Sequence, residues 1–129
     1  MEAMSMNVAA LDSAAPIAGA RDSTRGFLGG LVPAIAAGAA DAVVLVVSEL
    51  VTNALRHAGG TCALELTAYP DTIEVAVHDR SPQAPRTRTP DLNDGTGGFG
   101  WPMVNRLARS TAVTGQAAGG KTVSAHLTR

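Results

Sequence analysis

The segment SELVTNALRHA, residues 48–58, carries three polar side chains that could bind a ligand or transfer a proton. They lie at intervals of four residues: Glu49, Asn53 and His57. On a helix with about 100° per residue, these side chains lie within about 80° of one another, beside an apolar stripe. Asn is a poor helix former, so its place in mid-helix is unexpected on a purely solvated face. Its amide oxygen suits a hard cation such as Mg²⁺, and the carboxylate one turn earlier can accept a proton. The alternative is the ordinary solvated face of an amphipathic helix.

Further along the chain, three short segments carry groups that a nucleotide would need. Asp79 closes an alternating apolar run and needs hydrogen-bond donors, which a purine amino group or the following turn could supply. Residues 97–102, GGFGWP, lead glycines into the start of a helix, where backbone N–H groups favour phosphate. Residues 119–122, GGKT, open the last predicted strand, and by themselves they are typical of a hairpin turn followed by a solvated lysine.

Length and composition limit the kind of protein that carries these groups. The chain has 129 residues, a formal net charge of −1 and a single cysteine, Cys62, so we expect one domain without an internal disulfide. The balanced charge gives no basic footprint for direct nucleic-acid binding. We find neither a secretory signal nor a run of about 20 apolar residues, and we therefore expect a soluble, cytoplasmic protein without a membrane span.

The hydrophobic patterns predict a β-α-α-β-β-lid-α-β-β order. We expect a first strand at residues 6–12, a loosely helical segment at 18–31, and a helix from an N-cap at Asp41 to residue 58. Strands are predicted at residues 61–69, 72–79, 111–115 and 121–128, with a further helix at 101–109. The polar, proline-rich residues 80–98 form a predicted lid, and residues 1–6 a flexible N-terminus. The expected fold is a single-domain α+β two-layer sandwich, with about three helices on one face of a mostly antiparallel, mixed sheet.

The order and spacing of these segments resemble the Bergerat-fold (GHKL) ATPases, the superfamily of gyrase, the heat-shock chaperone and sensor histidine kinases. SELVTNALRHA is similar to their N-box, VHDRSP at residues 77–82 to their adenine box, and GFG at 98–100 to a glycine box. With the closing GGKTV, residues 7–127 look like the small bacterial anti-sigma-factor serine kinases.

The resemblance implies a role for each matching residue. Glu49 would be the catalytic general base, Asn53 would hold the Mg²⁺ that bridges the phosphates of ATP, and Asp79 would read the adenine amino group. The other residues that it assigns to nucleotide binding are Arg56, His57, Ser81, Pro82, Gly98, Phe99, Gly100 and Thr122, the last of these near the base. Arg21 matches an arginine on the first helix of relatives, on a surface implicated in partner binding.

Two departures from the family pattern concern the predicted lid. Ser81 and Gln83 stand where the wider superfamily has glycines, and Thr96 stands where kinases of this group carry an arginine that neutralises charge on the γ-phosphate. Arg86 or Arg88 could supply that charge instead.

The resemblance implies an ATP-binding anti-sigma factor with serine/threonine kinase activity toward an anti-anti-sigma antagonist in a partner-switching circuit. Its partners would be a sigma factor and that antagonist. A homodimer formed through the edge of the first strand is also possible. The alternative is a catalytically silent ATP-binding interaction module that controls a partner through ordering of the lid.

Overall fold

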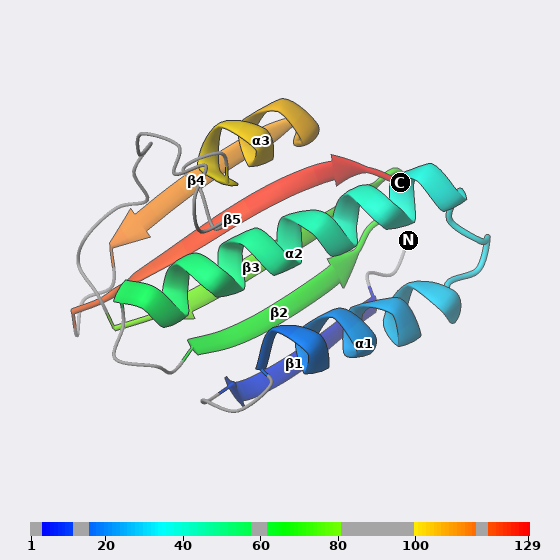
Figure 1. Ribbon diagram of the computed structural model, residues 1–129. Helices are drawn as coiled ribbons and strands as arrows, with labels where there is room; N and C mark the ends of the chain where they lie inside the picture. Colours follow the sequence, from blue (N-terminus) through cyan, green and yellow to red (C-terminus); the bar gives the residue numbers. More distant parts are fainter. Residues whose placement is uncertain (1–3, 12–15, 58–61, 81–99, 116–118) are drawn as a thin grey trace, which may run out of the picture.

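The computed structural model describes residues 4–11, 16–57, 62–80, 100–115 and 119–129. Its elements follow in the order β1-α1-α2-β2-β3-α3-β4-β5. The three described helices lie on one face of a sheet, so the described chain forms two layers (Figure 1). This arrangement confirms the predicted α+β sandwich.

The sheet has five described strands in the spatial order β1-β2-β3-β5-β4. The strands are β1 Met4–Leu11, β2 Cys62–Ala68, β3 Thr72–Asp79, β4 Ser110–Gly115 and β5 Lys121–Thr128. Each of the four described strand pairs is antiparallel. The predicted sheet is mostly antiparallel but mixed, and the described strands contain no parallel pair. β1 and β4 are the outer strands.

Alternating side chains divide the sheet into a buried face and an open face. β2 buries every second residue from Cys62 to Ala68, and β5 does the same from Lys121 to Leu127. The two central strands β3 and β5 pair residue by residue, from Thr72 with Thr128 to Asp79 with Lys121. Since side chains alternate along a strand, the register fixes which residues face the helices at each end of the sheet.

The core between the two layers consists mainly of aliphatic side chains, in a chain of which only 3% of the residues are aromatic. Its fully buried large members are Val43, Val46, Val47, Val51, Leu64, Leu66, Ile73, Val75, Val77, Val104 and Leu127. All three described helices and the strands β2, β3 and β5 therefore contribute to one core, which fixes their positions relative to one another.

The central helix α2, Ala37–His57, begins one turn earlier than the sequence predicts. Asp41 is not its N-cap: the Ala40 N–H donates to the Ala36 carbonyl at 2.9 Å, and Asp41 lies exposed within the helix. Alanine is the best helix former, so the alanine-rich segment before Asp41 extends the helix.

Measured by length and composition alone, α2 could cross a membrane. The segment Ala37–Arg56 contains an 18-residue window of mean hydropathy 1.5, which corrects the expectation that the chain lacks such a stretch. The core helix of a soluble protein has the same properties. In the structure α2 lies across the sheet and buries its valine stripe there, so its hydropathy reflects its place in the core (Figure 1).

The other two helices flank α2 on the same face of the sheet. Helix α1, Pro16–Gly29, runs beside α2, and α3, Gly100–Leu107, follows the predicted lid. Pro102 lies in the first turn of α3, where a missing N–H costs no helical hydrogen bond. α3 ends two residues earlier than predicted, because the Arg109 N–H already donates to the His126 carbonyl of β5 at 2.7 Å.

Candidate functional site

The side of α2 that carries Glu49 and Asn53 contacts the beginning of α3 at Glu49. Glu49 and Asn53 are both half-buried and lie one turn apart on the same side of the helix. A Cβ built on Gly100 would lie 2.5 Å from Glu49 Oε2, closer than real Cβ contacts. The first residue of α3 therefore lies directly against the carboxylate, and only glycine fits there without a shift of the Glu49 side chain. The chain thus brings Glu49 and Gly100 together, although 50 residues separate them.

The second part of the site lies at the end of β3. Asp79 is directly opposite Lys121, the first residue of β5, and Lys121 Nζ lies 3.0 Å from both Oδ1 and Oδ2. The side chains are 1% exposed for Asp79 and 6% for Lys121, so this is a buried ion pair. A buried carboxylate requires such a counter-charge, because desolvation without one costs several kcal/mol, of order 3–5 when the partner is removed.

Gly120 makes this close arrangement possible. Its φ of +86° lies in the region that favours glycine, as does the φ of +89° at Gly119. A Cβ at Gly120 would collide with the Asp79 carbonyl oxygen and lie 3.0 Å from Arg80 Cα. The two glycines thus let β5 start against the end of β3, with Lys121 on the face that also carries Asp79.

Cys62 lies near the same carboxylate. Burial raises the pKa of the Cys62 thiol from 9.0 to about 11, and the negative charge of Asp79 adds to the rise. Cys62 begins β2 on the helix-facing side of the sheet. The thiol is a small buried side chain, and it provides a probe of the charge at Asp79.

Thr122, which the resemblance assigns to the base, faces the other side of the sheet. It pairs with His78, and its Oγ1 lies 2.7 Å from His78 Nδ1. The residue of GGKT that faces Asp79 is Lys121, so the structure does not bring the Thr122 side chain to the Asp79 carboxylate. The alternating pattern of β5 contains this information, since Lys121 shares a face with Val123, Ala125 and Leu127.

The structure describes only some of the other predicted site residues. Arg56 is exposed near the end of α2, and His57 is the last residue of that helix. Residues 81–98 of the predicted lid and Phe99 fall outside the described residues, which leaves out the predicted or alternative site residues Ser81, Pro82, Gln83, Arg86, Arg88, Thr96, Gly98 and Phe99.

The described side chains fit the chemistry of a magnesium nucleotide. Mg²⁺ keeps several waters and takes phosphate oxygens. Asn53 would offer it one amide oxygen as a protein ligand. Among the described residues, no group of three or more His, Cys, Asp or Glu could hold a metal ion without such help. Glu49 provides a carboxylate beside the start of α3, and Asp79 provides a buried carboxylate that is paired with Lys121.

The described helices and antiparallel strands together define an α+β sandwich. A family model described as a histidine kinase-like ATPase domain matches residues 13–127 of the chain. The chain therefore belongs to the histidine kinase-like ATPase domain family, whose members have the GHKL fold and bind ATP. A search of curated proteins finds no match.

Proposed function

We propose that this protein is an ATP-dependent serine/threonine kinase that acts as an anti-sigma factor. Its phosphoryl acceptor would be a hydroxyl of an anti-anti-sigma antagonist domain, and its second partner a sigma factor. ATP, the sigma factor and the antagonist are all available in the cytoplasm, which is where we expect the protein to act.

The contact between Glu49 and Gly100 carries the kinase proposal. Glu49 is half-buried and lies beside the first residue of α3, the helix that follows the predicted lid in the sequence. Bound ATP supplies the γ-phosphoryl group. Glu49 accepts the proton of the substrate hydroxyl as the hydroxyl oxygen bonds to the γ-phosphorus and the bond to the leaving ADP breaks. Asn53, one turn further along α2, would hold Mg²⁺, which would neutralise charge on the phosphates.

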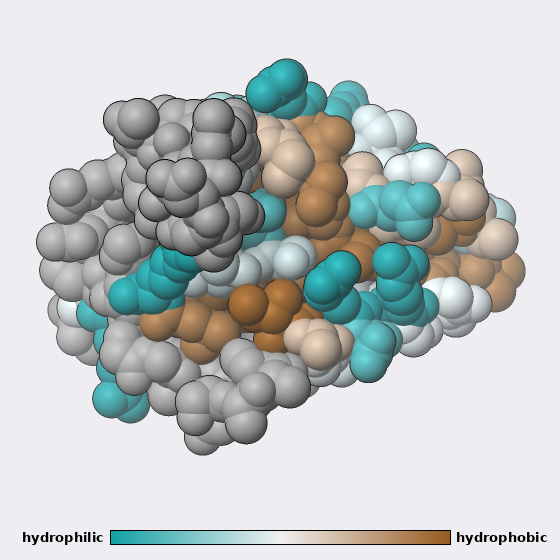
Figure 2. Space-filling model, in the orientation of Figure 1, coloured by the Kyte–Doolittle hydropathy of each residue, from teal (hydrophilic) through white to brown (hydrophobic). Residues whose placement is uncertain are grey.

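The surface of α1 supports the partner-binding part of the proposal. Arg21 and Arg25 are exposed and lie one turn apart, and Arg25 lies 3.7 Å from the exposed Asp41 of α2. Hydrophilic residues gather where α1 and α2 run side by side (Figure 2). An ion pair this exposed contributes only about 0–1 kcal/mol to stability, so Arg25 can exchange Asp41 for an acidic partner at little cost.

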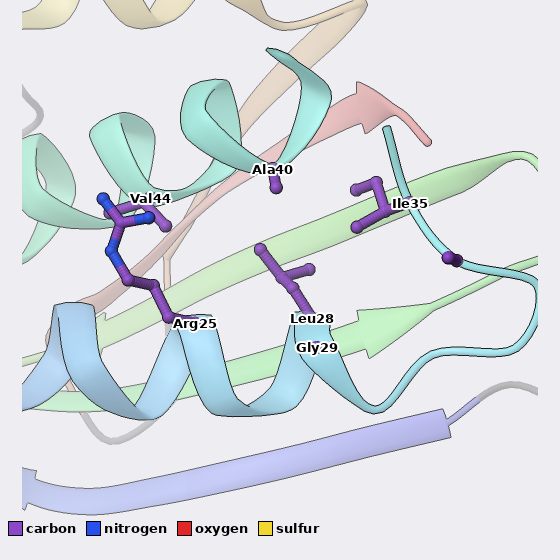
Figure 3. Close-up of a pocket in the computed structure, with 7 residues that line it drawn as sticks. Arg25, Leu28, Gly29, Ile35, Ala40 and Val44 are labelled. Atoms are coloured by element: carbon purple, nitrogen blue, oxygen red, sulfur yellow. The ribbon is translucent and has the colours of Figure 1, made fainter. Parts of the chain in front are cut away.

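Arg25 also lines a hollow between α1 and α2. Leu28 reaches from α1 toward Ala40 and Val44 of α2, and Ile35 closes the end (Figure 3). Its volume is about 250 Å³, and its lining is mostly apolar. Val44 lies about two and a half turns before Asn53 on α2, and Ala40 about three and a half turns, so a partner here would not compete with nucleotide. The exposed Arg21 and Arg25 and the apolar hollow together suit a helix or loop of a partner that carries an acidic and an aliphatic residue.

The kinase proposal is tested by transfer of radiolabelled phosphate. The protein is incubated with γ-labelled ATP, Mg²⁺ and a candidate antagonist domain from the same genome, with Glu49→Ala beside wild type. We expect labelled antagonist with wild type and a loss of about 10²- to 10⁴-fold in Glu49→Ala. Transfer that survives in Glu49→Ala would contradict the role of Glu49. Tight ATP binding without any transfer would instead support the silent interaction module, for which Thr96 is the sequence argument.

A further inference from the structure

The connection between α1 and α2 is apolar over five consecutive residues, 32–36, with the sequence VPAIA. Four of these residues are exposed, and Ile35 is half-buried. Val32 is 86% exposed, whereas the other exposed large hydrophobic residues among those that the structure describes reach at most 42%. Connections are usually rich in polar residues, glycine and proline, and a run of three or more exposed apolar residues is uncommon unless it has a function. Residues 32–36, which we call the apolar connection, therefore indicate an interaction surface.

The Arg129 side chain ties the apolar connection to the sheet. Its Nη2 donates to the Pro33 carbonyl at 2.6 Å, and its Nη1 donates to the Tyr69 carbonyl at 3.0 Å. The Arg129 backbone N–H also donates to the Asp71 carbonyl at 3.0 Å, which holds the arginine at the turn between β2 and β3. The bond to Pro33 is the one hydrogen bond that residues 32–35 form with the rest of the described chain. A segment that is held in place loses less conformational entropy on binding, so Arg129 prepares the apolar connection for a partner.

The apolar connection borders the hollow between α1 and α2. Ala34 and Ile35 of the connection line this hollow, together with Leu28 of α1 and Val44 of α2 (Figure 3). Hydrophobic residues are gathered at this end of the molecule, at the right of the view (Figure 2). Val32 and the hollow therefore belong to one apolar surface, which is more than the single exposed apolar side chain that is ordinary on soluble proteins.

The position of the apolar connection distinguishes between the two proposed partners. Ala37, the residue that follows the connection, lies about 18 Å along α2 from Glu49. The antagonist must bring its hydroxyl to Glu49, whereas the sigma factor takes no part in phosphoryl transfer and can bind at the far end of α2.

The charges beside the apolar connection also favour a partner of different chemistry over a second copy of this chain. They are Arg129, Arg25, which lines the hollow, and Asp41, which lies 3.7 Å from Arg25. Two copies of this surface would bring arginines together, whereas an apolar groove with acidic residues at its rim would complement them.

We propose that the apolar connection is the contact surface for the sigma factor. Val32 is the side chain that enters an apolar groove on this partner, and Arg129 is the residue that positions the connection. This inference rests on the proposed function, because it assigns one of the two proposed partners to a surface. Loss of Val32 therefore weakens binding of the sigma factor but leaves binding of ATP and of the antagonist unchanged.

The test titrates each purified sigma factor from the same genome into the protein by calorimetry. We expect wild type to bind one of them, and Val32→Ser to bind it at least about tenfold more weakly. Val113→Ser is the matched control, because Val113 is a 42% exposed valine on β4, and it should bind as wild type does. Arg129→Gln loses the hydrogen bonds of the guanidinium and should bind about three- to tenfold more weakly. The affinities for ATP and for the antagonist should stay within about twofold of wild type in all three variants.

Equal sigma-factor affinity in Val32→Ser and Val113→Ser would overturn the inference and leave the proposed function intact. An equally large loss of antagonist affinity in Val32→Ser would also overturn it. A wild-type dimer that dissociates in Val32→Ser, measured by sedimentation equilibrium, would assign the surface to a second copy instead. Vesicles of phosphatidylglycerol that retain wild type but not Val32→Ser would assign it to a membrane. A wild type that binds no sigma factor would overturn the proposed function, and the inference with it.

Discussion

Gly100 of α3 lies directly against the Glu49 carboxylate of α2, so that a Cβ at this position would be 2.5 Å from Glu49 Oε2. This contact joins the first residue of α3, the helix that follows the predicted lid in the sequence, to the proposed catalytic base. The Glu49 carboxylate can keep its position only because residue 100 has no side chain.

Gly100→Ala should therefore impair phosphotransfer more than nucleotide binding. The added methyl group displaces the Glu49 carboxylate, and a displacement of about 1 Å can cost on the order of 100-fold in rate. Gly26→Ala is the control, because Gly26 lies within α1 and a Cβ there meets no atom within 4 Å. The control should keep full activity and gain about 0.5–1 kcal/mol in free energy of unfolding. Equal phosphotransfer rates in the two variants would contradict the importance of this contact.

The buried ion pair predicts that mutations of Asp79 and Lys121 have strongly non-additive effects on the free energy of unfolding. Lys121→Met leaves the Asp79 carboxylate buried without its ammonium, and we expect the free energy of unfolding to fall by about 3–5 kcal/mol. The double variant Asp79→Asn with Lys121→Met removes both charges and should recover a large part of that loss. Urea unfolding of wild type, both single variants and the double variant measures the coupling. A Lys121→Met variant within about 0.5 kcal/mol of wild type would show that the pair is solvated.

Cys62 reports on the charge of Asp79. Its thiol pKa is raised to about 11 in the fold from 9.0, so folding favours the protonated thiol. A raised pKa contributes stability that is complete below pH 9 and is lost as the pH rises through about 11. Titration of the thiolate by its ultraviolet absorbance should give this raised pKa, and a lower one in Asp79→Asn. An unchanged pKa in Asp79→Asn would mean that burial is the whole cause.

Charge reversal on α1 should separate partner binding from nucleotide binding. Arg21→Glu places a negative charge on the proposed docking surface, and we expect partner affinity to fall by about tenfold or more while ATP affinity stays the same. Arg109→Glu reverses an exposed charge near the start of β4 and is the matched control. Pull-down or calorimetric titration with the antagonist domain gives the affinities. A greater loss in Arg109→Glu than in Arg21→Glu would locate the partner elsewhere.

Most of the fold could be predicted from the sequence, because hydrophobic periodicity records the burial of each element. The change from period 3.6 to period 2 after α2 marks β2 and β3. The start of α2 could not be predicted from a capping signal, since Asp41 has the right residue type but the alanines before it continue the helix. Local capping preference is about 1 kcal/mol, and a run of alanines with tertiary packing exceeds it.

The site could be predicted only in part, because two of its contacts join distant residues. Glu49 and Asp79 are visible as polar residues at the margins of apolar patterns. The contact of Glu49 with Gly100, and that of Asp79 with Lys121, depend on how α3 and β5 are placed by the sheet. A lysine after two glycines is typical of a solvated hairpin, and only its register with β3 shows that it is buried.

Calorimetric titration with Mg²⁺ and ATP tests the nucleotide site most directly, using wild type and Asn53→Ala. Asn53 is half-buried on the surface ridge of α2, so its truncation should leave the fold intact, as circular dichroism would verify. We predict that wild type binds the nucleotide and that Asn53→Ala binds it at least about tenfold more weakly in the presence of Mg²⁺. Equal affinity in the two proteins, or no binding by either, would contradict the site described here.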